Sequence, residues 1–379
     1  MRSAPTAAAA QERELLAAAR KGDEGAYRAL VEPHRAELIA HCYRITGSVH
    51  DAEDAIQDAM LRAWRGLSRF EGRSSARSWL YRIATNACLD VVARRRKRVL
   101  PIDYGPPARP DEGPGEPLLE SVWIEPCADE SLGLDDGLAA PDARYEQRES
   151  VELAFVAALQ HLPANQRAAL ILRDVLGFSA QEVAETLETT VASVNSALQR
   201  ARQNVDERLP EQSQQATLRS LGDERIRELV ERYMDAMQRG DVDAVVAMLA
   251  EDATWSMPPL QIWFRGRSEI ARFLADYAFT VRWRHLPTRV NGQPTAACYA
   301  WDEEQGMYVG SILDVLTLEG SRIAEVTSFG TSEVFRRLVP GARPYATSEL
   351  FRRFGLPDAL PAQQGRNLIA MRTMGRTRR

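Results

Sequence analysis

The sequence predicts a multidomain protein in which two all-α helical domains are followed by a C-terminal α+β cone. Apolar residues recur with helical periodicity up to Arg98 and again over residues 149–204. The stretch between them is rich in proline, glycine and acidic residues, as is typical of a linker. After residue 223, helical patterns give way to β-rich runs. The predicted divisions are residues 1–98, 99–147, 148–210, 220–338 and 339–379.

The charge of the chain is distributed unevenly. The net charge is only −5, but the first 98 residues carry 18 Lys and Arg against 12 acidic residues, whereas residues 99–147 carry two against twelve. Basic segments bind nucleic acid, and acidic segments often occupy the same place. A content of 45% apolar residues in 379 is enough for two or three buried cores.

The cysteines and the apolar runs limit the class of protein. Cys42, Cys88, Cys127 and Cys298 show no CxxC or metal-ligand spacing, so we predict reduced thiols and neither a metal site nor a cofactor. No apolar run reaches the length of a membrane span. We therefore expect a cytoplasmic protein without a membrane partner.

An acidic helix is predicted from Asp51 to Trp64. Its core side carries alanines together with Ile56 and Met60. The opposite side carries a lone apolar residue surrounded by acceptors, a pattern that suits a partner helix bearing arginines. The residues of this outer side are Asp54, Gln57, Asp58 and Leu61.

A second, basic helix follows from Ala76. Trp79 and Leu80 are predicted to be buried, while Tyr81, Arg82 and Thr85 are predicted to lie on the outside. Between residues 69 and 98 there are nine Lys and Arg against two acidic residues. This excess can hold a phosphate backbone.

The blocks at residues 51–58, 62–64, 70–75 and 79–86 resemble conserved region 2 of the bacterial sigma-70 family, in its extracytoplasmic-function group. The resemblance implies that Asp54, Gln57, Asp58 and Leu61 contact the clamp helices of the largest subunit of core RNA polymerase. It also implies that the basic helix and the turn before it hold melted promoter DNA at the minus-ten element, where a base is extruded. The residues expected there are Arg73, Ser74, Tyr81, Arg82, Arg94, Arg95 and Arg96.

A helix-turn-helix is predicted near residue 190. Ser179 and Glu182 have the spacing of a capping box, and a short turn leads into a helix over residues 191–205. The polar side of that helix is able to enter a major groove. This block resembles sigma region 4, which implies contacts to the minus-thirty-five element and to the flap of the second-largest polymerase subunit. The residues expected on the DNA are Ser193, Asn195, Ser196, Gln199, Arg200 and Arg202.

The linker contains eight prolines, which prevent a long regular element. The resemblance implies that this segment passes near the polymerase active site. Its acids either mimic nucleic acid there or merely keep a spacer in solution. Residues 119–126 form an apolar island that we expect to pack on a neighbouring domain.

The last third of the sequence predicts three helices, near residues 226–237, 241–249 and 270–277, and a curved antiparallel sheet. The order of elements, with Asp241, Trp255 and the Phe264–Arg267 run, resembles SnoaL-like domains of the nuclear transport factor 2-like superfamily. Sigma factors with such a domain form a subgroup that includes the actinobacterial sigma factor G type. The DGGGK-type motif of another such subgroup is absent from this sequence. The predicted strands are residues 253–257, 281–287, 296–301, 308–318 and 322–328.

A cavity is expected inside the cone, but no acid and base pair can be placed in it, so we identify no catalytic residue. Three roles remain open for the cone: catalysis, binding of a small apolar effector, and regulation through protein contacts. The basic tail from Phe335 is either solvated or in contact with promoter DNA or the acidic linker. The residues predicted to line the cavity are Trp255, Met257, Trp263, Phe273, Tyr277, Trp283 and Tyr299, with His285, Asp276 and Asn291 as polar candidates.

Together these patterns predict a bacterial transcription initiation factor that binds core RNA polymerase and promoter DNA, is modulated by its own cone, and is not an enzyme. One alternative is a SnoaL-type isomerase or hydrolase fused to a DNA-binding segment. Another is an ordinary helix-turn-helix repressor, which would bind DNA without polymerase.

Overall fold

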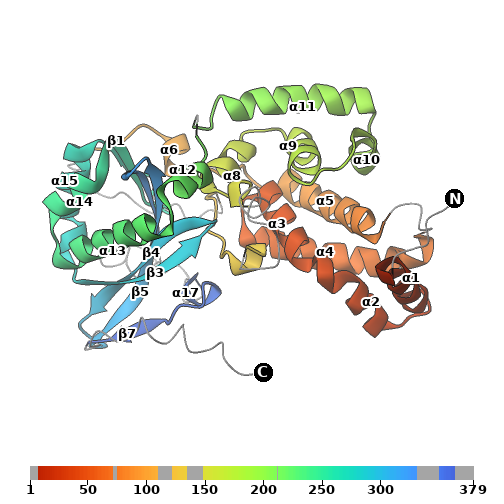
Figure 1. The fold of residues 1–379 in the computed structure, drawn as a ribbon, viewed down its shortest axis with the longest axis horizontal. Coiled ribbons are helices and arrows are strands. Elements are labelled where there is room, and N and C mark those ends of the chain that lie inside the picture. The colour runs from red at the N-terminus through yellow and green to blue at the C-terminus, as the bar shows by residue number, and fades with distance from the viewer. Residues whose placement is uncertain are drawn as a thin grey trace. The chain divides into compact units, whose positions relative to one another are not determined.

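The computed structural model describes residues 7–70, 75–109, 122–134, 148–210, 212–330 and 350–362. Contacts divide the chain into two compact units (Figure 1). The N-terminal unit comprises Met1–Val99 and Ser121–Ser213, and the C-terminal unit comprises Leu100–Glu120 and Gln214–Arg379. The multidomain fold class predicted from the sequence is confirmed, and the linker contributes to both units.

The N-terminal unit begins with a helical module, which we call the N-terminal module (residues 7–98). A turn at Glu32–His34 separates the helix that Asp23 caps from the next helix, because Pro33 has no N–H to donate. Ser48 and Ser75 cap the two helices that follow by accepting from the N–H groups of Asp51 and Ser78. The helices are α1 (Ala7–Ala19), α2 (Glu24–Val31), α3 (Arg35–Thr46), α4 (Val49–Gly66) and α5 (Ala76–Arg94).

The second part of the N-terminal unit is the helix-turn-helix module (residues 148–210). The predicted capping box is confirmed, since Ser179 and Glu182 each bond to the other's backbone N–H. Helix α9 ends in a π-helical turn over Ile171–Val175, and Thr190 caps the helix that follows the tight turn. The helices are α8 (Leu153–Gln160), α9 (Ala164–Leu170), α10 (Ala180–Thr186) and α11 (Val191–Asp206).

The apolar island of the linker packs as expected. Val122, Trp123 and Ile124 are buried, and Trp123 pairs with Val99 in a parallel bridge within the N-terminal unit. A short helix, α6 (Pro101–Tyr104), lies in the part of the linker that belongs to the C-terminal unit.

The C-terminal unit is a mixed sheet with helices packed against it. The prediction of a purely antiparallel sheet is wrong, because β1 pairs with β6 in parallel. The strand order is β2-β1-β6-β5-β4-β3, with β7 paired to β5. The helices are α12 (Gln214–Leu221), α13 (Asp223–Arg239), α14 (Val242–Met248) and α15 (Arg267–Asp276). The strands are β1 (Leu249–Ser256), β2 (Trp263–Arg265), β3 (Trp283–Val290), β4 (Gln293–Asp302), β5 (Met307–Glu319) and β6 (Arg322–Gly330).

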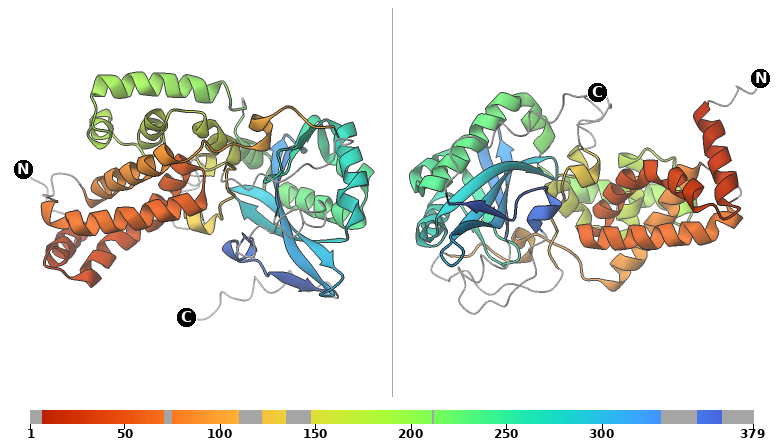
Figure 2. Two further views of the ribbon diagram at one scale, coloured as in Figure 1. Left: turned by 180° about the vertical axis from the view of Figure 1, so that it is seen from behind. Right: turned by 90° about the horizontal axis from the view of Figure 1, so that it is seen from below.

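One apolar cluster joins the sheet to its helices. Tyr233 of α13, Trp255 of β1 and Phe264 of β2 are buried in it, with Phe273 of α15. Figure 2 shows the strongly curved blue strands and the green helices packed against them from two further directions. The curvature leaves an enclosed space between α13, α15 and the sheet, which the cavity described below occupies.

Part of the basic tail is ordered on the sheet. The ordered part contains helix α17 (Leu350–Arg353) and strand β7 (Ala359–Pro361), which pairs with β5. Phe351 is buried against the ring of Tyr299, with centroids 5.0 Å apart. A solvated tail is therefore wrong for residues 350–361, while residues 331–349 and 363–379 lie outside the described part of the chain.

Candidate nucleic-acid interface and ligand cavity

The outer face of α4 has the composition expected from the sequence. Leu61 is 55% exposed, and the side chains of Asp54 and Asp58 are about half exposed, with Gln57 also on the surface. Asp58 accepts an ion pair from Arg62 at 2.6 Å, and Arg62 also reaches Asp90 of α5 at 2.9 Å. The structure thus gathers Asp54, Gln57 and Asp58 around the exposed Leu61, a surface suited to a basic, apolar partner helix.

The predicted DNA face of α5 is only partly on the surface. Arg82, Arg94, Arg95 and Arg96 are exposed, whereas Arg73 and Ser74 lie outside the described residues. The expectation that Tyr81 and Thr85 lie outside is wrong, because they are only 1% and 0% exposed. The physical reason is packing: Thr85 contacts His41 of α3, and Tyr81 lies between α3 and Phe178 of the neighbouring module.

Tyr81 is covered by Phe178 of the helix-turn-helix module and by two charged side chains of its own module, Arg77 and Glu37. The ring of Phe178 meets the ring of Tyr81 edge-on at 5.4 Å, and the guanidinium of Arg77 lies 4.8 Å from the Tyr81 centroid. The Tyr81 hydroxyl donates to Glu37 at 3.2 Å. Burial raises the pKa of Tyr81, and the Glu37 carboxylate raises it further. Tyr81 is therefore a neutral interface residue in this arrangement.

Two buried arginines also stabilise the contact between the N-terminal module and the helix-turn-helix module. Arg44 of α3 donates to the backbone carbonyl and hydroxyl oxygens of Ser150, at 3.0 and 2.7 Å. Arg167 of α9 donates to the carbonyl oxygens of Ile45 and Leu162 and to Gln160. Burial lowers the pKa of each guanidinium to about 10, so both stay charged at neutral pH.

Gly47 makes the close approach of the two modules possible. It ends α3 with φ of 69°, a left-handed conformation that glycine adopts without strain. A Cβ there would lie 3.0 Å from the side chain of Gln160 in α8. Any larger residue would therefore both strain the turn and push α8 away.

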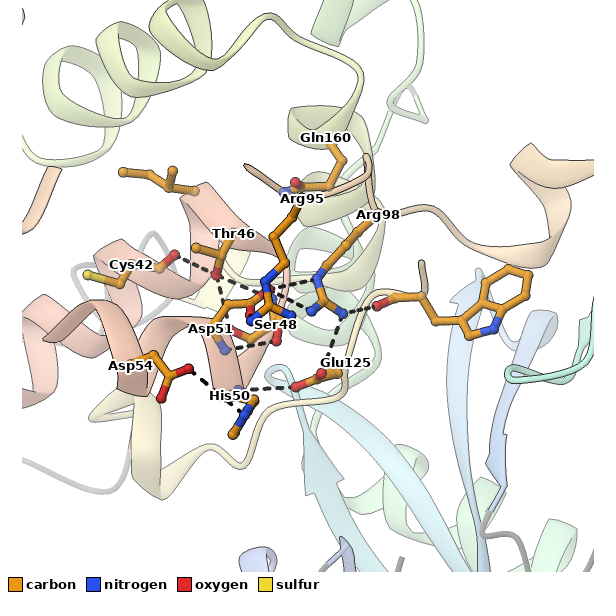
Figure 3. A network of polar contacts seen from close by, with 12 residues as sticks. Cys42, Thr46, Ser48, His50, Asp51, Asp54, Arg95, Arg98, Glu125 and Gln160 are labelled. Carbon is orange, nitrogen blue, oxygen red and sulfur yellow. Dashed lines mark hydrogen bonds and ion pairs between the residues drawn. The ribbon is translucent and has the colours of Figure 1, made fainter. Parts of the chain in front are cut away.

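A buried network of ion pairs joins α4 to the residues just before the linker, Arg95 and Arg98. Figure 3 shows Asp51 of α4, which is 2% exposed, between the guanidinium groups of Arg95 and Arg98. Arg98 reaches the Asp51 carboxylate at 2.6 Å and Arg95 reaches it at 3.1 Å. Arg98 also donates to the Trp123 carbonyl at 2.7 Å. From the sequence, Arg98 was predicted only as one member of a basic run. Its partner Asp51 lies 47 positions earlier, so no local pattern reveals the pair.

Helix α11 presents its predicted face without obstruction in the N-terminal unit. Ser193, Asn195, Ser196, Gln199, Arg200 and Arg202 are all exposed, while Val194, Leu198 and Ala201 are buried. Arg202 is bound by Asp174 through two hydrogen bonds of 2.8 and 2.7 Å. Arg202 is thus fixed in place before any nucleic acid arrives.

The cavity of the C-terminal unit has a volume of about 30 Å³ and is lined by five of the ten predicted residues. These are Trp255, Met257, Phe273, Trp283 and His285. Tyr277 stacks on Phe273 but does not line the cavity, and Trp263, Asp276 and Asn291 do not line it either. The prediction for Tyr299 is wrong, because His285 pairs with Cys298 and side chains alternate along a strand, so Tyr299 points to the opposite face of the sheet. The lining residues that the sequence did not reveal are Met237, Ala278, Cys298, Ile312, Asp314 and Ser328.

Asp314 is the buried acid of this cavity, and neutral donors surround it. The hydroxyls of Tyr233 and Ser328 donate to its two oxygens at 2.8 and 2.5 Å, and the Cys298 thiol lies at 3.3 Å. Burial raises the pKa of Asp314, and these donors partly offset the rise. Since its oxygens are already occupied, Asp314 is not poised as a general base. A lone carboxylate within the apolar run of β5 was the signal that could have revealed it.

His285 has no such partners. It is 8% exposed, and neither ring nitrogen has a hydrogen-bond partner among the described residues. Burial lowers its pKa to about 3, so the ring is neutral at physiological pH. A buried imidazole without partners is costly, and an occupant that bonds to it would remove that cost.

Within the described ranges, no group of three or more His, Cys, Asp or Glu side chains is arranged to hold a metal ion. The helices in those ranges include none that is both long and apolar enough to cross a membrane.

Three family models match the chain. Sigma-70 region 2 matches residues 30–98, sigma-70 region 4 matches residues 152–205, and a SnoaL-like domain matches residues 230–326. The two regions expected from the sequence blocks and the SnoaL-like cone are therefore confirmed.

The chain is similar to sigma factors of known identity. The chain is 38% identical to the ECF RNA polymerase sigma factor SigG of Mycobacterium tuberculosis over 344 residues, 90% of this chain and 86% of that relative. It is 32% identical to the ECF RNA polymerase sigma factor SigE of Mycolicibacterium smegmatis over 199 residues, 51% of this chain and 66% of the relative. The crystal structure of the Mycobacterium tuberculosis extracytoplasmic function sigma factor SigJ has a TM-score of 0.51 at 23% identity, covering 82% of this chain and 99% of that chain. This last likeness concerns the fold.

Proposed function

The chain belongs to the extracytoplasmic-function group of RNA polymerase sigma factors, and from that premise we propose which of its surfaces perform each step of initiation. As a sigma factor it binds core RNA polymerase and directs promoter-specific initiation of transcription, and it is not an enzyme. Its SnoaL-like domain is a regulatory module in this context. We propose that it acts in the cytoplasm, because initiation needs polymerase and promoter DNA in one compartment.

We propose that α4 is the main polymerase contact, through the clamp helices of the largest subunit. The observation that carries this assignment is the exposed Leu61 surrounded by Asp54, Gln57 and Asp58. A leucine that stays exposed in a folded domain, ringed by acceptors, favours an arginine-bearing helix over solvent. The flap of the second-largest subunit is the proposed partner of the helix-turn-helix module.

The test is a binding measurement with core polymerase. The double variant Asp54→Ala with Asp58→Ala should lose at least tenfold in affinity, because two charge-assisted contacts disappear. Glu24→Ala with Glu32→Ala removes two exposed acids outside α4 and should stay within twofold of wild type. Equal affinities for the two double variants would refute the assignment of α4.

For promoter DNA, we propose that Arg82, Arg94 and Arg96 hold the melted minus-ten strand, together with Arg95, Arg73 and Ser74. Tyr81 joins this set only when the helix-turn-helix module moves off α5, because that module covers its ring. The exposed face of α11, from Ser193 to Arg202, is the proposed reader of the minus-thirty-five major groove.

We further propose that the cavity of the C-terminal unit binds a small apolar effector. Its walls are aromatic and thioether side chains, and His285 offers one donor and one acceptor with no internal partner. The volume of about 30 Å³ accommodates a water-sized occupant, so a larger ligand displaces Met237 or Met257, whose side chains are flexible. The occupied oxygens of Asp314 favour binding over catalysis.

Phenol and toluene are suitable probes, because they have similar size and only phenol carries a hydroxyl. Phenol at tenfold above its dissociation constant should raise the melting temperature of the C-terminal unit by about 3 °C, and toluene should raise it less. His285→Leu should abolish the preference for phenol. Equal shifts with both probes in the wild-type chain would remove His285 from the site.

A further inference from the structure

The linker contains a segment that the assignments above leave unused. Residues 100–109 form part of the C-terminal unit, with Leu100 and Pro101 buried. Figure 1 shows the orange segment after α6 reaching the sheet near β1. The linker was expected to be a spacer, yet this stretch makes specific contacts to one strand.

A single tryptophan makes those contacts. The indole Nε1 of Trp263 donates to the carbonyl oxygen of Gly105 at 2.8 Å. The backbone N–H of Ala108 donates to the carbonyl oxygen of Trp263, also at 2.8 Å. Ala108 packs against the apolar cluster of the C-terminal unit. Trp263 thus binds both ends of a four-residue stretch.

The sequence of that stretch suits this mode of binding. Pro106 and Pro107 have no N–H groups and fix their own φ angles, so little conformational entropy is lost on docking. An indole N–H that donates to a carbonyl of a proline-rich segment is a common recognition mode for such peptides. The two prolines are exposed, so the segment lies on the surface, and Ala108 is its member that packs, partly buried, against the apolar cluster.

The position of Trp263 explains why the site is available. It lies in β2, which ends the strand order of the sheet, so the outer side of β2 has no other strand beside it. Exposed strand edges readily accept an extended segment. The carbonyl of Trp263 is the acceptor that this edge offers.

We propose that the edge strand β2 is a docking site for the linker, occupied in cis by residues 105–108, and that this docking restrains the two promoter-binding modules. The base of the same loop is closed in the N-terminal unit, where Val99 donates to Val122 at 2.8 Å and Ile124 donates to Val99 at 3.1 Å. While Val99 is bonded to Val122 and Ile124, residues 100–121 add no length to the linker that connects the two modules. Docking of residues 105–108 on β2 stabilises the contacts of Val99 with Val122 and Ile124, because the docked loop is not free to extend as part of an open linker.

Linker capture therefore lowers initiation, since the two modules must separate along the linker to engage two promoter elements at once. Release of residues 105–108 from β2 returns the full linker to the span. The C-terminal unit thus acts as an inhibitor whose target is the linker of its own chain.

Two variants of the full chain remove one hydrogen bond each, from opposite partners. Trp263→Phe keeps an aromatic ring but loses the indole donor, and Ala108→Pro removes the backbone donor. Both should raise hydrogen exchange at least tenfold in the peptide covering residues 100–109, without changing exchange in residues 226–237 of α13. Glu319→Ala, at the exposed end of β5, keeps both hydrogen bonds and should match wild type.

The same variants test regulation in transcription with core polymerase. Trp263→Phe and Ala108→Pro should each increase run-off transcript at least twofold over wild type and over Glu319→Ala. The proposal is overturned if residues 100–109 exchange freely in the wild-type chain, or if exchange rises in both variants while transcript yield does not. This readout rests on the initiation function. Absence of transcript from every variant, wild type included, would contradict that function, whereas exchange reports docking independently.

Discussion

The two proposed DNA-binding faces of the N-terminal unit differ in their accessibility. All six side chains of the α11 face are exposed, whereas Tyr81 of the α5 face is 1% exposed beneath Phe178. The helix-turn-helix module therefore leaves its own DNA face open while it covers part of its neighbour's. The comparison teaches that the two modules cannot both present complete DNA faces in this arrangement.

The chemistry of the contact explains how the covered state can be both specific and reversible. Arg44 and Arg167 are buried, charged, and bonded to carbonyl, hydroxyl and amide oxygens. Burying a guanidinium is costly, and each regains its hydration when the modules part. The contact is thus held by well-aligned hydrogen bonds whose loss water partly compensates.

The largest expected effect comes from removing the Arg167 guanidinium. Arg167→Met should lower the unfolding free energy of the N-terminal unit by about 3 kcal/mol, because several buried carbonyls lose their donor. Arg200→Met, on the exposed face of α11, should change it by less than about 0.5 kcal/mol. Denaturant unfolding followed by tryptophan fluorescence measures both. Similar small losses would mean that the modules are not held together by Arg167.

Acidification should lower the stability of the N-terminal unit through His41, which lies beside α5. His41 lies under Tyr81 with ring centroids 5.1 Å apart, bonds Thr85 at 2.8 Å, and has its pKa lowered from 6.5 to about 3 by burial. A lowered histidine pKa means that the unfolded state takes up the proton first. Stability therefore falls as the pH decreases from 6.5 toward 3, by about 2 kcal/mol at pH 5.

The pH effect is isolated by comparing wild type with His41→Leu in denaturant unfolding at pH 7 and pH 5. His41→Leu should reduce the loss of unfolding free energy between pH 7 and pH 5 by about 2 kcal/mol. His285 contributes equally to the wild-type protein and to the variant, so its effect cancels. An unchanged pH dependence in the variant would contradict a neutral, buried His41.

The smallest effect separates two arginines of the open face. Arg200→Ala should lower transcription from a promoter that depends on its minus-thirty-five element by about tenfold, as expected for a lost base contact. Arg202→Ala should lower it less, because Asp174 already binds that guanidinium. Run-off assays on one promoter compare them directly. A larger loss for Arg202 would reverse the assignment of these two residues.

Local signals predicted much of the N-terminal unit. The capping box of Ser179 and Glu182, together with apolar periodicity, predicted α4, α5, α10 and α11, and with them the exposed faces around Leu61 and Arg200. The burial of Tyr81 was not predictable, because Phe178 lies 97 positions later and its approach depends on how two modules pack. The Asp51 and Arg98 pair escaped for the same reason.

In the C-terminal unit, the order of elements and several cavity residues followed from pattern. The parallel pairing of β1 with β6 did not, because pairing partners far apart in sequence leave no local trace. The prediction that Tyr299 lines the cavity was wrong because the strand register was unknown. The register decides the face of the sheet on which each side chain lies. Strands β2 and β7 have three residues each, too few for a periodic signal.

The central claim is that this chain initiates transcription only together with core polymerase. The most direct test is run-off transcription from genomic templates with purified bacterial core enzyme, alongside footprinting with and without that enzyme. The account predicts discrete transcripts and a footprint that both require polymerase, with fewer transcripts when Asp54 and Asp58 are replaced by alanine. Specific footprints by the chain alone, or no transcript from any template with the complete chain and core enzyme, would contradict it.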